Sequence, residues 1–297
     1  MMSYKEQIRR ALVAVSFTAT GNEKWNNVPV TDPTELLEER ADEELRQLAL
    51  RETLVQHLYS NFYCSGSPRN PRVNGSNLHK GGLAKQLSAA NAGIGAYHSN
   101  WKVIQSSLQG DALVVERDGL RLRAPRRIVQ VNGEKSSASV WLPKERLGLS
   151  PSYYMAMGNR TLPRGSKTPL SRLYWNVTPE AAVKLTRLLT ENLNSAELPF
   201  QLKLSNADVA IDRADAAVLY MLSDDLLRAK PIIESAHATV SEDLRPTIPA
   251  LTKPLAKGLA GAVDPMTGQS FGIHRCCLLA EAILMFRDAG HCDEEEH

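Results

Sequence analysis

The sequence has few cysteines and no long apolar run. Only four of its 297 residues are cysteine, and Cys64, Cys276, Cys277 and Cys292 lack the paired spacing of a zinc site. We interpret them as buried or incidental thiols of a reducing compartment, because a chain of this length can bury an ample core without disulfides. No apolar run approaches the roughly 20 residues of a membrane span, and the N-terminus shows no secretory cleavage signature. We therefore expect a cytoplasmic protein without a membrane partner.

A large excess of charge of one sign is also missing. The 35 basic and 33 acidic residues leave a net charge of +2. No global basic field therefore argues for a nucleic-acid partner, and any recognition of an anion must be local.

The first part of the chain combines helices with a β-meander. Residues 4–17 have an amphipathic helical pattern, and a second helix is expected from Asp32 to Cys64 with one apolar stripe, formed by Leu50, Leu54, Leu58 and Phe62. A loop rich in helix breakers follows at residues 65–82. From Trp101 the period changes to two, which predicts short strands at 101–106, 112–118, 120–124, 126–131 and 138–142.

Arginines gather on this meander, at positions 117, 121, 123, 126 and 127. A solvated sheet edge that is protected by charge is the ordinary explanation. The alternative is a docking surface for an acidic leader peptide or a partner.

The irregular segment 143–169, in which residues 150–157 suggest a helical turn, is interpreted as the boundary between two halves. We expect residues 1–165 to form a helical and β-meander half and residues 166–297 an α/β half with a mixed or antiparallel sheet. Together the two halves form one compact α+β unit in this interpretation. Thr178 and Pro179 have the composition of a helix start and open the crossover helix of the second half.

Two strands of the second half each have one apolar and one polar face. In RLYWNV at 172–177, Arg172, Tyr174 and Asn176 share a face, and in PFQLKLSN at 199–206 Lys203 lies on the polar face. If these strands lie side by side, they place Arg172, Tyr174, Lys203 and Arg213 in one concave cluster that suits an anion. An antiparallel sheet with one solvated face is the bland alternative.

The last quarter of the chain contributes further cations. A proline-punctuated segment, 246–257, brings Lys253 to a defined place, and the final helix, 271–289, opens with GIHR at 272–275. Arg275 in a first turn opposes the helix dipole unless an anion lies nearby.

Several ordered motifs resemble the HopA-type effector domain. They are RLYWNVTPE at 172–180, PFQLKLSN at 199–206, DRADAAVLY at 212–220, TKPLA at 252–256 and FGIHR at 271–275. The resemblance extends from the helix that ends at Tyr63 to the end of the chain. It implies either a type III effector or a lyase of ribosomal peptide biosynthesis, as in class V lanthipeptides and thioamitides. Such a lyase eliminates phosphate from phosphoserine or phosphothreonine of a precursor peptide and leaves dehydroalanine or dehydrobutyrine.

A more distant similarity to the bacterial phosphothreonine lyases implies the roles of individual residues. Arg172 and Tyr174 take the places of a lysine and a histidine on one strand, and Lys203 matches the base. Arg213 and Arg275 fall where phosphate ligands lie in that family, and we add Lys253 and Asn176 to the expected substrate-binding set. Because Tyr174 replaces a histidine, Tyr174 and His274 both stay candidates for the general acid. The resemblance implies no metal and no cofactor.

The chemistry fits these residue types. A neutral amine can take the α-proton if like charges lower its pKa, and arginine forks suit phosphate geometry. The chain has no kinase motif set of its own, so a separate Ser/Thr kinase is the expected partner beside the phosphorylated precursor peptide. The alternative is a non-catalytic module that only holds a phosphorylated partner of a kinase.

Overall fold

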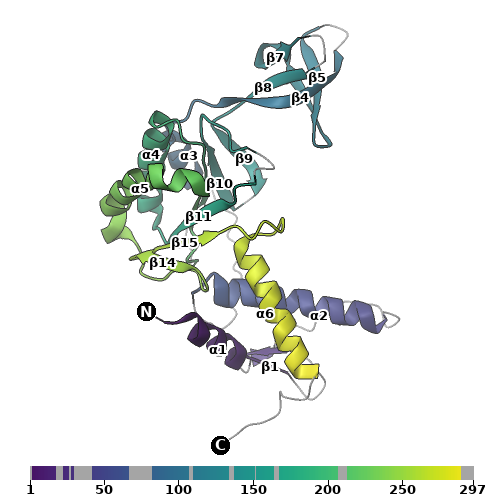
Figure 1. Ribbon diagram of the computed structural model, residues 1–297, viewed down its shortest axis with the longest axis vertical. Coiled ribbons are helices and arrows are strands. Elements are labelled where there is room, and N and C mark those ends of the chain that lie inside the picture. The colour runs from purple at the N-terminus through teal and green to yellow at the C-terminus, as the bar shows by residue number, and fades with distance from the viewer. Residues whose placement is uncertain are drawn as a thin grey trace, which may run out of the picture.

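The computed structural model describes residues 2–17, 23–26, 28–29, 42–66, 82–106, 110–133, 137–150, 152–163, 167–206 and 213–288. The predicted start of the second helix at Asp32 and most of the predicted loop at 65–82 lie outside these residues. Within them the fold is α+β, as predicted, with all strand pairs antiparallel. Figure 1 shows the meander at one end of the long axis and the main sheet with its helices in the middle. At the other end lie α1 (Tyr4–Ala14), α2 (Glu43–His57) and α6 (Phe271–Asp288).

The main sheet has seven strands in the order β14-β15-β11-β13-β12-β10-β9. Their bounds are β9 (Glu145–Ser150), β10 (Tyr153–Met157), β11 (Leu170–Trp175), β12 (Gln201–Ser205), β13 (Ala217–Leu222), β14 (Lys253–Ala256) and β15 (Leu259–Val263).

One sequence prediction about this sheet was wrong, and the condition placed on the strands of Arg172 and Lys203 is not met. Residues 153–157 are strand β10 and not a helical turn, since Tyr154 and Ala156 alternate into the core. The strands that carry Arg172 and Lys203 are not neighbours, because β13 pairs with both β11 and β12 and lies between them. β9 and β10 thus extend the sheet of the predicted second half; the division at residue 165 stays an interpretation of the sequence.

Helices α3 (Gly82–Ala90), α4 (Pro179–Ser195) and α5 (Leu226–Val240) cover one face of this sheet. Thr178 caps α4 by accepting a hydrogen bond from the Ala181 amide, and Pro179 occupies the first helical turn, as predicted. The principal core lies here, and Trp175, Leu185 and Leu202 are fully buried in it. Each such side chain contributes about 1.5–3 kcal/mol on burial. The helices cover this face of the main sheet, and the polar side chains of the strands lie on the opposite face.

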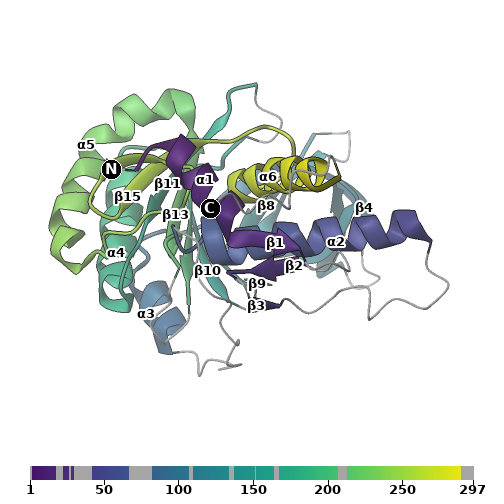
Figure 2. The ribbon, with the colours of Figure 1, turned by 90° about the horizontal axis from the view of Figure 1, so that it is seen from below.

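A second core lies at the base of the molecule, between α2 (Glu43–His57), the π-helix η2 (Leu58–Tyr63) and α6 (Phe271–Asp288). Figure 2 shows α2 and α6 crossing this region with α1 (Tyr4–Ala14) beside α6. Leu54, Leu58 and Phe62 of the predicted stripe are buried in this core. The stripe therefore crosses from an α-helix into a π-helix, whose wider turn is frequent at functional sites.

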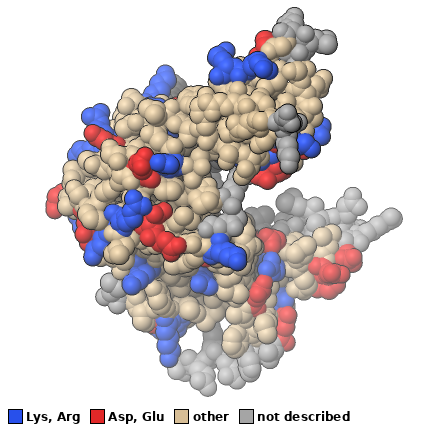
Figure 3. All heavy atoms as spheres, turned by 45° about the horizontal axis from the view of Figure 1, so that its top comes forward, with Lys and Arg blue, Asp and Glu red and all other residues tan. Residues whose placement is uncertain are grey.

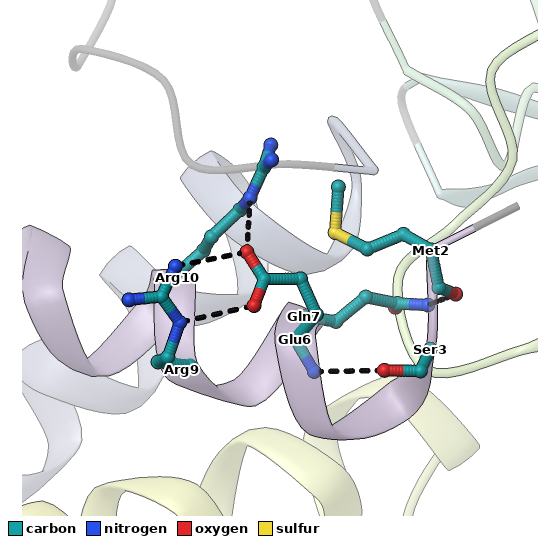
Figure 4. A network of polar contacts seen from close by, with 6 residues as sticks. All are labelled: Met2, Ser3, Glu6, Gln7, Arg9 and Arg10. Carbon is teal, nitrogen blue, oxygen red and sulfur yellow. Dashed lines mark hydrogen bonds and ion pairs between the residues drawn. The ribbon is translucent and has the colours of Figure 1, made fainter.

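Helix α1 ends at Ala14, earlier than predicted, because Val15–Phe17 forms strand β1 and pairs with β2 (Glu23–Trp25), which pairs with β3 (Val28–Pro29). In Figure 4, Ser3 accepts a hydrogen bond from the Glu6 amide, and the Glu6 carboxylate pairs with Arg9 and Arg10. The arginines lower the pKa of Glu6 to about 2.

The predicted meander is confirmed as a five-stranded sheet of order β6-β5-β4-β8-β7. Its strands are β4 (Ala96–Ser106), β5 (Ala112–Arg117), β6 (Leu120–Pro125), β7 (Val129–Asn132) and β8 (Ser137–Leu142), and the 3-10 turn η3 (Arg126–Ile128) precedes β7. Further 3-10 turns are η4 (Ser223–Asp225) and η5 (Ser241–Asp243). None of the described helices is both long and apolar enough to cross a membrane.

Candidate functional site

The face of the main sheet opposite α4 and α5 carries a row of polar side chains. Lys203 on β12 and Tyr174 on β11 are both paired with Val218 on β13. Paired residues project to the same face, so these two side chains point to one side with a strand between them, about 10 Å apart at the backbone. In the next row Arg172 is paired with Tyr220. Three consecutive strands therefore present an amine, a phenol and a guanidinium on one surface.

The Lys203 amine is partly buried against an aromatic ring. Its Nζ atom lies 3.7 Å from the centroid of the Tyr153 ring. Burial is the main cause that lowers the pKa of Lys203, and the positive charges of Arg213 and Arg172 lower it further, whereas Asp215 opposes the shift. The environment thus favours the neutral amine more than water does.

Arg213, which acts electrostatically on this amine, is oriented by hydrogen bonds to two side chains. Its Nε and Nη2 atoms donate to the two carboxylate oxygens of Asp215, each at 2.9 Å, and Nη2 also donates to the Tyr59 hydroxyl at 3.2 Å. The Ala214 amide donates to the Cys64 carbonyl at 2.7 Å, which ties this turn to the end of η2. Burial by itself would lower the pKa of Arg213, but the Asp215 carboxylate outweighs it and the pKa is raised. Arg213 is therefore a permanent, oriented cation.

Arg172 has an equivalent carboxylate partner. Its Nε and Nη2 atoms donate to Asp264, and its guanidinium lies 5.2 Å from the centroid of the Tyr220 ring. Both side chains of the ion pair are at least 85% shielded, with 11% and 15% exposed. Burial opposes the charge of Arg172, but the hydrogen bonds to Asp264 raise its pKa.

Tyr174 is buried, with 3% exposed, and is hydrogen-bonded to Tyr63 of η2. Burial raises the pKa of Tyr174, while the Tyr63 hydrogen bond and the Arg172 charge lower it; the same bond raises the pKa of Tyr63. The two phenols are therefore coupled, and each shifts the proton affinity of the other. Close packing needs Gly272 in α6, because a Cβ atom there would lie 2.4 Å from the Tyr63 ring.

The predicted residues fall into three groups. Arg172, Tyr174 and Lys203 lie on the face opposite α4 and α5, Arg213 lies in the turn before β13, and all four interact electrostatically with one another or with shared neighbours. Asn176 lies at the end of β11 and donates to the Thr247 carbonyl at 2.9 Å, so it anchors the segment that follows α5.

The C-terminal members of the predicted set lie elsewhere on the fold. Arg275 and Lys253 line a second cavity, whose lining includes neither Lys203 nor Arg213. His274 is in the first turn of α6, and its Nδ1 atom is buried with no hydrogen-bond partner among the described residues. The assigned roles of these three residues stay predictions.

Other side chains of the site were missed by the sequence reasoning. Asp215 and Asp264 hold the two arginines, and three tyrosines, Tyr59, Tyr63 and Tyr153, enclose the cluster. Asp215 carried a usable signal, since it stands two residues after Arg213 within one quoted motif. The tyrosines carried none, because they come from η2 and β10, far from the motif in the chain.

A cavity of about 940 Å³ lies at the edge of the main sheet, and its lining includes none of Lys203, Arg172, Tyr174 and Arg213. Asp264, the partner of Arg172, lines it, and so does Gln201, which is on the same face of β12 as Lys203. The opposite wall comes from the meander, including Ser99 and Asn100. On the face that Figure 3 shows, cations lie in separate groups among acidic residues.

Comparison with known protein families identifies the family of this chain. The profile of the HopA1 effector protein family matches residues 144–295, slightly more than half of the sequence. The chain belongs to the HopA1 effector protein family. Its matched part runs from β9 to α6, so the HopA1 region includes Lys203, Arg213 and Arg172, while Tyr59 and Tyr63 precede it.

Two solved structures of effector proteins resemble this chain. One is the effector protein from Pseudomonas syringae pv. tomato strain DC3000, with 14% identity, coverage of 85% of this chain and 82% of that chain, and a TM-score of 0.43. The other is the effector protein from Pseudomonas syringae pv. syringae strain 61, with 13% identity, coverage of 80% and 91%, and a TM-score of 0.41. No curated protein matches the chain.

Proposed function

We propose that this HopA1-family protein is a carbon–oxygen lyase that eliminates phosphate from phosphoserine or phosphothreonine in a peptide. The observation that carries the proposal is the Lys203 amine, which is shielded by Tyr153 and has a lowered pKa beside two oriented arginines. The products would be inorganic phosphate and a dehydroalanine or dehydrobutyrine residue.

Lys203 would act as the base. In its neutral form Nζ takes the α-proton of the phosphorylated residue. The electron pair left on the α-carbon forms the Cα–Cβ double bond, and the Cβ–O bond breaks so that its electron pair leaves with the phosphate. Lys203 then carries the proton and returns it to solvent.

Arg213 and Arg172 would stabilise the charges of this reaction. A guanidinium has five N–H donors, and Asp215 and Tyr59 take only the Nε and Nη2 side of Arg213. The Nη1 donors are not used in these bonds and are available to a phosphate oxygen. Arg172 would stabilise the negative charge of the same phosphate or of the developing enolate. Electrostatic stabilisation of this type typically lowers the activation free energy by about 3 kcal/mol.

Tyr174 is the better supported of the two candidate acids. It lies in the row of Lys203, and it interacts electrostatically with Arg172. His274 is in α6, and none of the described contacts joins it to the Lys203 cluster.

Incubation of the protein with phosphoserine and phosphothreonine peptides tests the proposal. Elimination lowers the peptide mass by one phosphoric acid, and the new double bond adds a thiol. We expect Lys203→Ala to lose elimination by about two to four orders of magnitude while it still binds the phosphopeptide. Lys184→Ala, at an exposed position of α4, is the matched control. Equal rates for Lys203→Ala and the parent would contradict the assignment of the base.

The ion pairs favour one alternative, a module that binds phosphopeptides without chemistry. Both arginines already have carboxylate partners, which fix the orientation of each guanidinium. A site with cations oriented in this way can hold a phosphate without reacting with it. Such a module would bind the phosphopeptide more tightly than the unmodified peptide and leave its mass unchanged. Arg213→Ala would lose that preference in either case.

The biological setting follows from the substrate. A phosphorylated peptide requires a separate Ser/Thr kinase, and a precursor peptide with its kinase would place the reaction in lanthipeptide-type biosynthesis. A type III secreted effector is the alternative setting. Co-expression of the chain with a candidate kinase and precursor peptide distinguishes them, since only biosynthesis yields dehydrated precursor.

A further inference from the structure

An apolar groove opens at the base of the molecule, between α1 and α6. It encloses about 560 Å³, and its floor is formed by Gly261 and Ala262 of β15. Figures 1 and 2 show the two helices flanking this end of the main sheet. Ala262, which is paired with Arg172 and shares its face, contributes only a methyl group to this floor.

Both helices present exposed apolar side chains to the groove. Tyr4 and Ile8 of α1 are 49% and 38% exposed, and Leu278 of α6 is 49% exposed. Tyr4 and Ile8 are one turn apart, and so are Leu278 and Ala282, so each wall is a row of the kind that a third helix packs against. Isolated exposed apolar residues need no explanation, but a lined groove between two helices marks an interaction site.

Cations mark one part of the same groove. Lys253 is exposed, and Arg275 lies with its guanidinium 4.9 Å from the centroid of the Phe271 ring. No carboxylate residue is among the described residues that line the groove. Its charge is therefore complementary to an acidic ligand.

We propose that this groove, between α1 and α6, binds an acidic amphipathic helix of a partner protein. The apolar side of that helix would cover Ile8 and Leu278, and its carboxylates would meet Lys253 and Arg275. The inference does not depend on the lyase reaction, since its readout is binding alone.

Fluorescence anisotropy with labelled helical peptides tests the proposal on the full chain. The probe is a peptide of about 18 residues, roughly 27 Å of helix, with leucines at positions i, i+3, i+4 and i+7 and glutamates on the other face. A matched peptide has lysines in place of the glutamates. We expect the acidic peptide to bind and the basic peptide to bind at least about tenfold more weakly.

Substitutions of groove residues test whether the acidic peptide binds in the groove. Ile8→Asp and Leu278→Asp should each weaken the acidic peptide by about tenfold or more, and Leu227→Asp, at an 81% exposed position of α5, should leave it unchanged. Lys253→Glu combined with Arg275→Glu should reverse the preference between the two peptides. Circular dichroism confirms that each variant is folded.

Other occupants give distinguishable results. If sedimentation velocity shows a dimer that Leu278→Asp dissociates, the groove is covered by a second copy and the proposal is overturned. Displacement of the acidic peptide by a fatty acid, together with equal binding of both peptides, would assign the groove to an acyl chain and also overturn it. Absence of binding by either peptide would do the same.

Discussion

The Nζ atom of Lys203 lies 3.7 Å from the centroid of the Tyr153 ring. The two residues form a diagonal pair across β10 and β12, because the direct partner of Lys203 is Met155. The ring attracts the protonated amine through its π face but also keeps water away from it. Burial is the main cause that lowers the pKa of Lys203. Because the Tyr153 ring covers the amine, we expect it to contribute to that burial.

Replacing Tyr153 should change the pH dependence of elimination. We expect Tyr153→Ala to admit water to Lys203 and raise its pKa toward the ordinary value. Because the base must be neutral, the rising limb of kcat/KM against pH should move to higher pH. Tyr153→Phe keeps the ring and should leave the limb in place. A limb that moves to lower pH in Tyr153→Ala would show that the ring acts mainly by stabilising the cation.

The lowered pKa of Lys203 also predicts how stability depends on pH. Between the lowered folded pKa and the ordinary value of 10.5, the unfolded chain binds more protons than the folded chain. The free energy of unfolding therefore rises with pH across this window. Lys203→Met removes the contribution, so urea unfolding should show the wild-type protein gaining on the variant as the pH increases. Lys184→Met is the control, and an equal trend in both variants would contradict the prediction.

Asp215→Asn should act on the same base with the opposite sign to Tyr153→Ala. The Asp215 carboxylate raises the pKa of Lys203, so its removal should lower that pKa further and move the rate limb to lower pH. Arg213 loses its bidentate partner, and we expect weaker phosphopeptide binding and a stability loss of about 1–3 kcal/mol. Asp225→Asn, which removes a pair with the exposed Arg228, is the control. An unchanged limb would place Asp215 outside the electrostatics of the base.

The side chains that share the open face could be predicted from alternation alone. A strand has a period of two, so Arg172 and Tyr174 share a face whatever the strand pairs with. The order of the strands could not be predicted in this way. Insertion of β13 between β11 and β12 depends on contacts far apart in the chain, and it sets the spacing between Tyr174 and Lys203.

The helical spacing of apolar residues predicted where a buried helix lies but not its type. The apolar stripe predicted a buried helix through Leu58 and Phe62, but apolar spacing does not distinguish an α-helix from the π-helix that follows it. The π turn aims Tyr59 and Tyr63 at the sheet, where their rings stack 5.5 Å apart. For α6, the chain order suggested that Arg275 joins the phosphate site. The cavity that Arg275 lines depends on how α6 packs against the rest of the fold, and the sequence does not specify this packing.

Gly272→Ala should destabilise the protein although alanine is the better helix former. At an ordinary helical position this change stabilises by about 1 kcal/mol, but here the new Cβ atom would lie 2.4 Å from the Tyr63 ring. The ring must move, so we expect a loss of about 1–3 kcal/mol in urea unfolding and slower elimination as the bond to Tyr174 is lost. In a Tyr63→Ala background the methyl group has room, and the same substitution should become neutral or stabilising. A penalty of equal size in both backgrounds would show that the Tyr63 contact is not its cause.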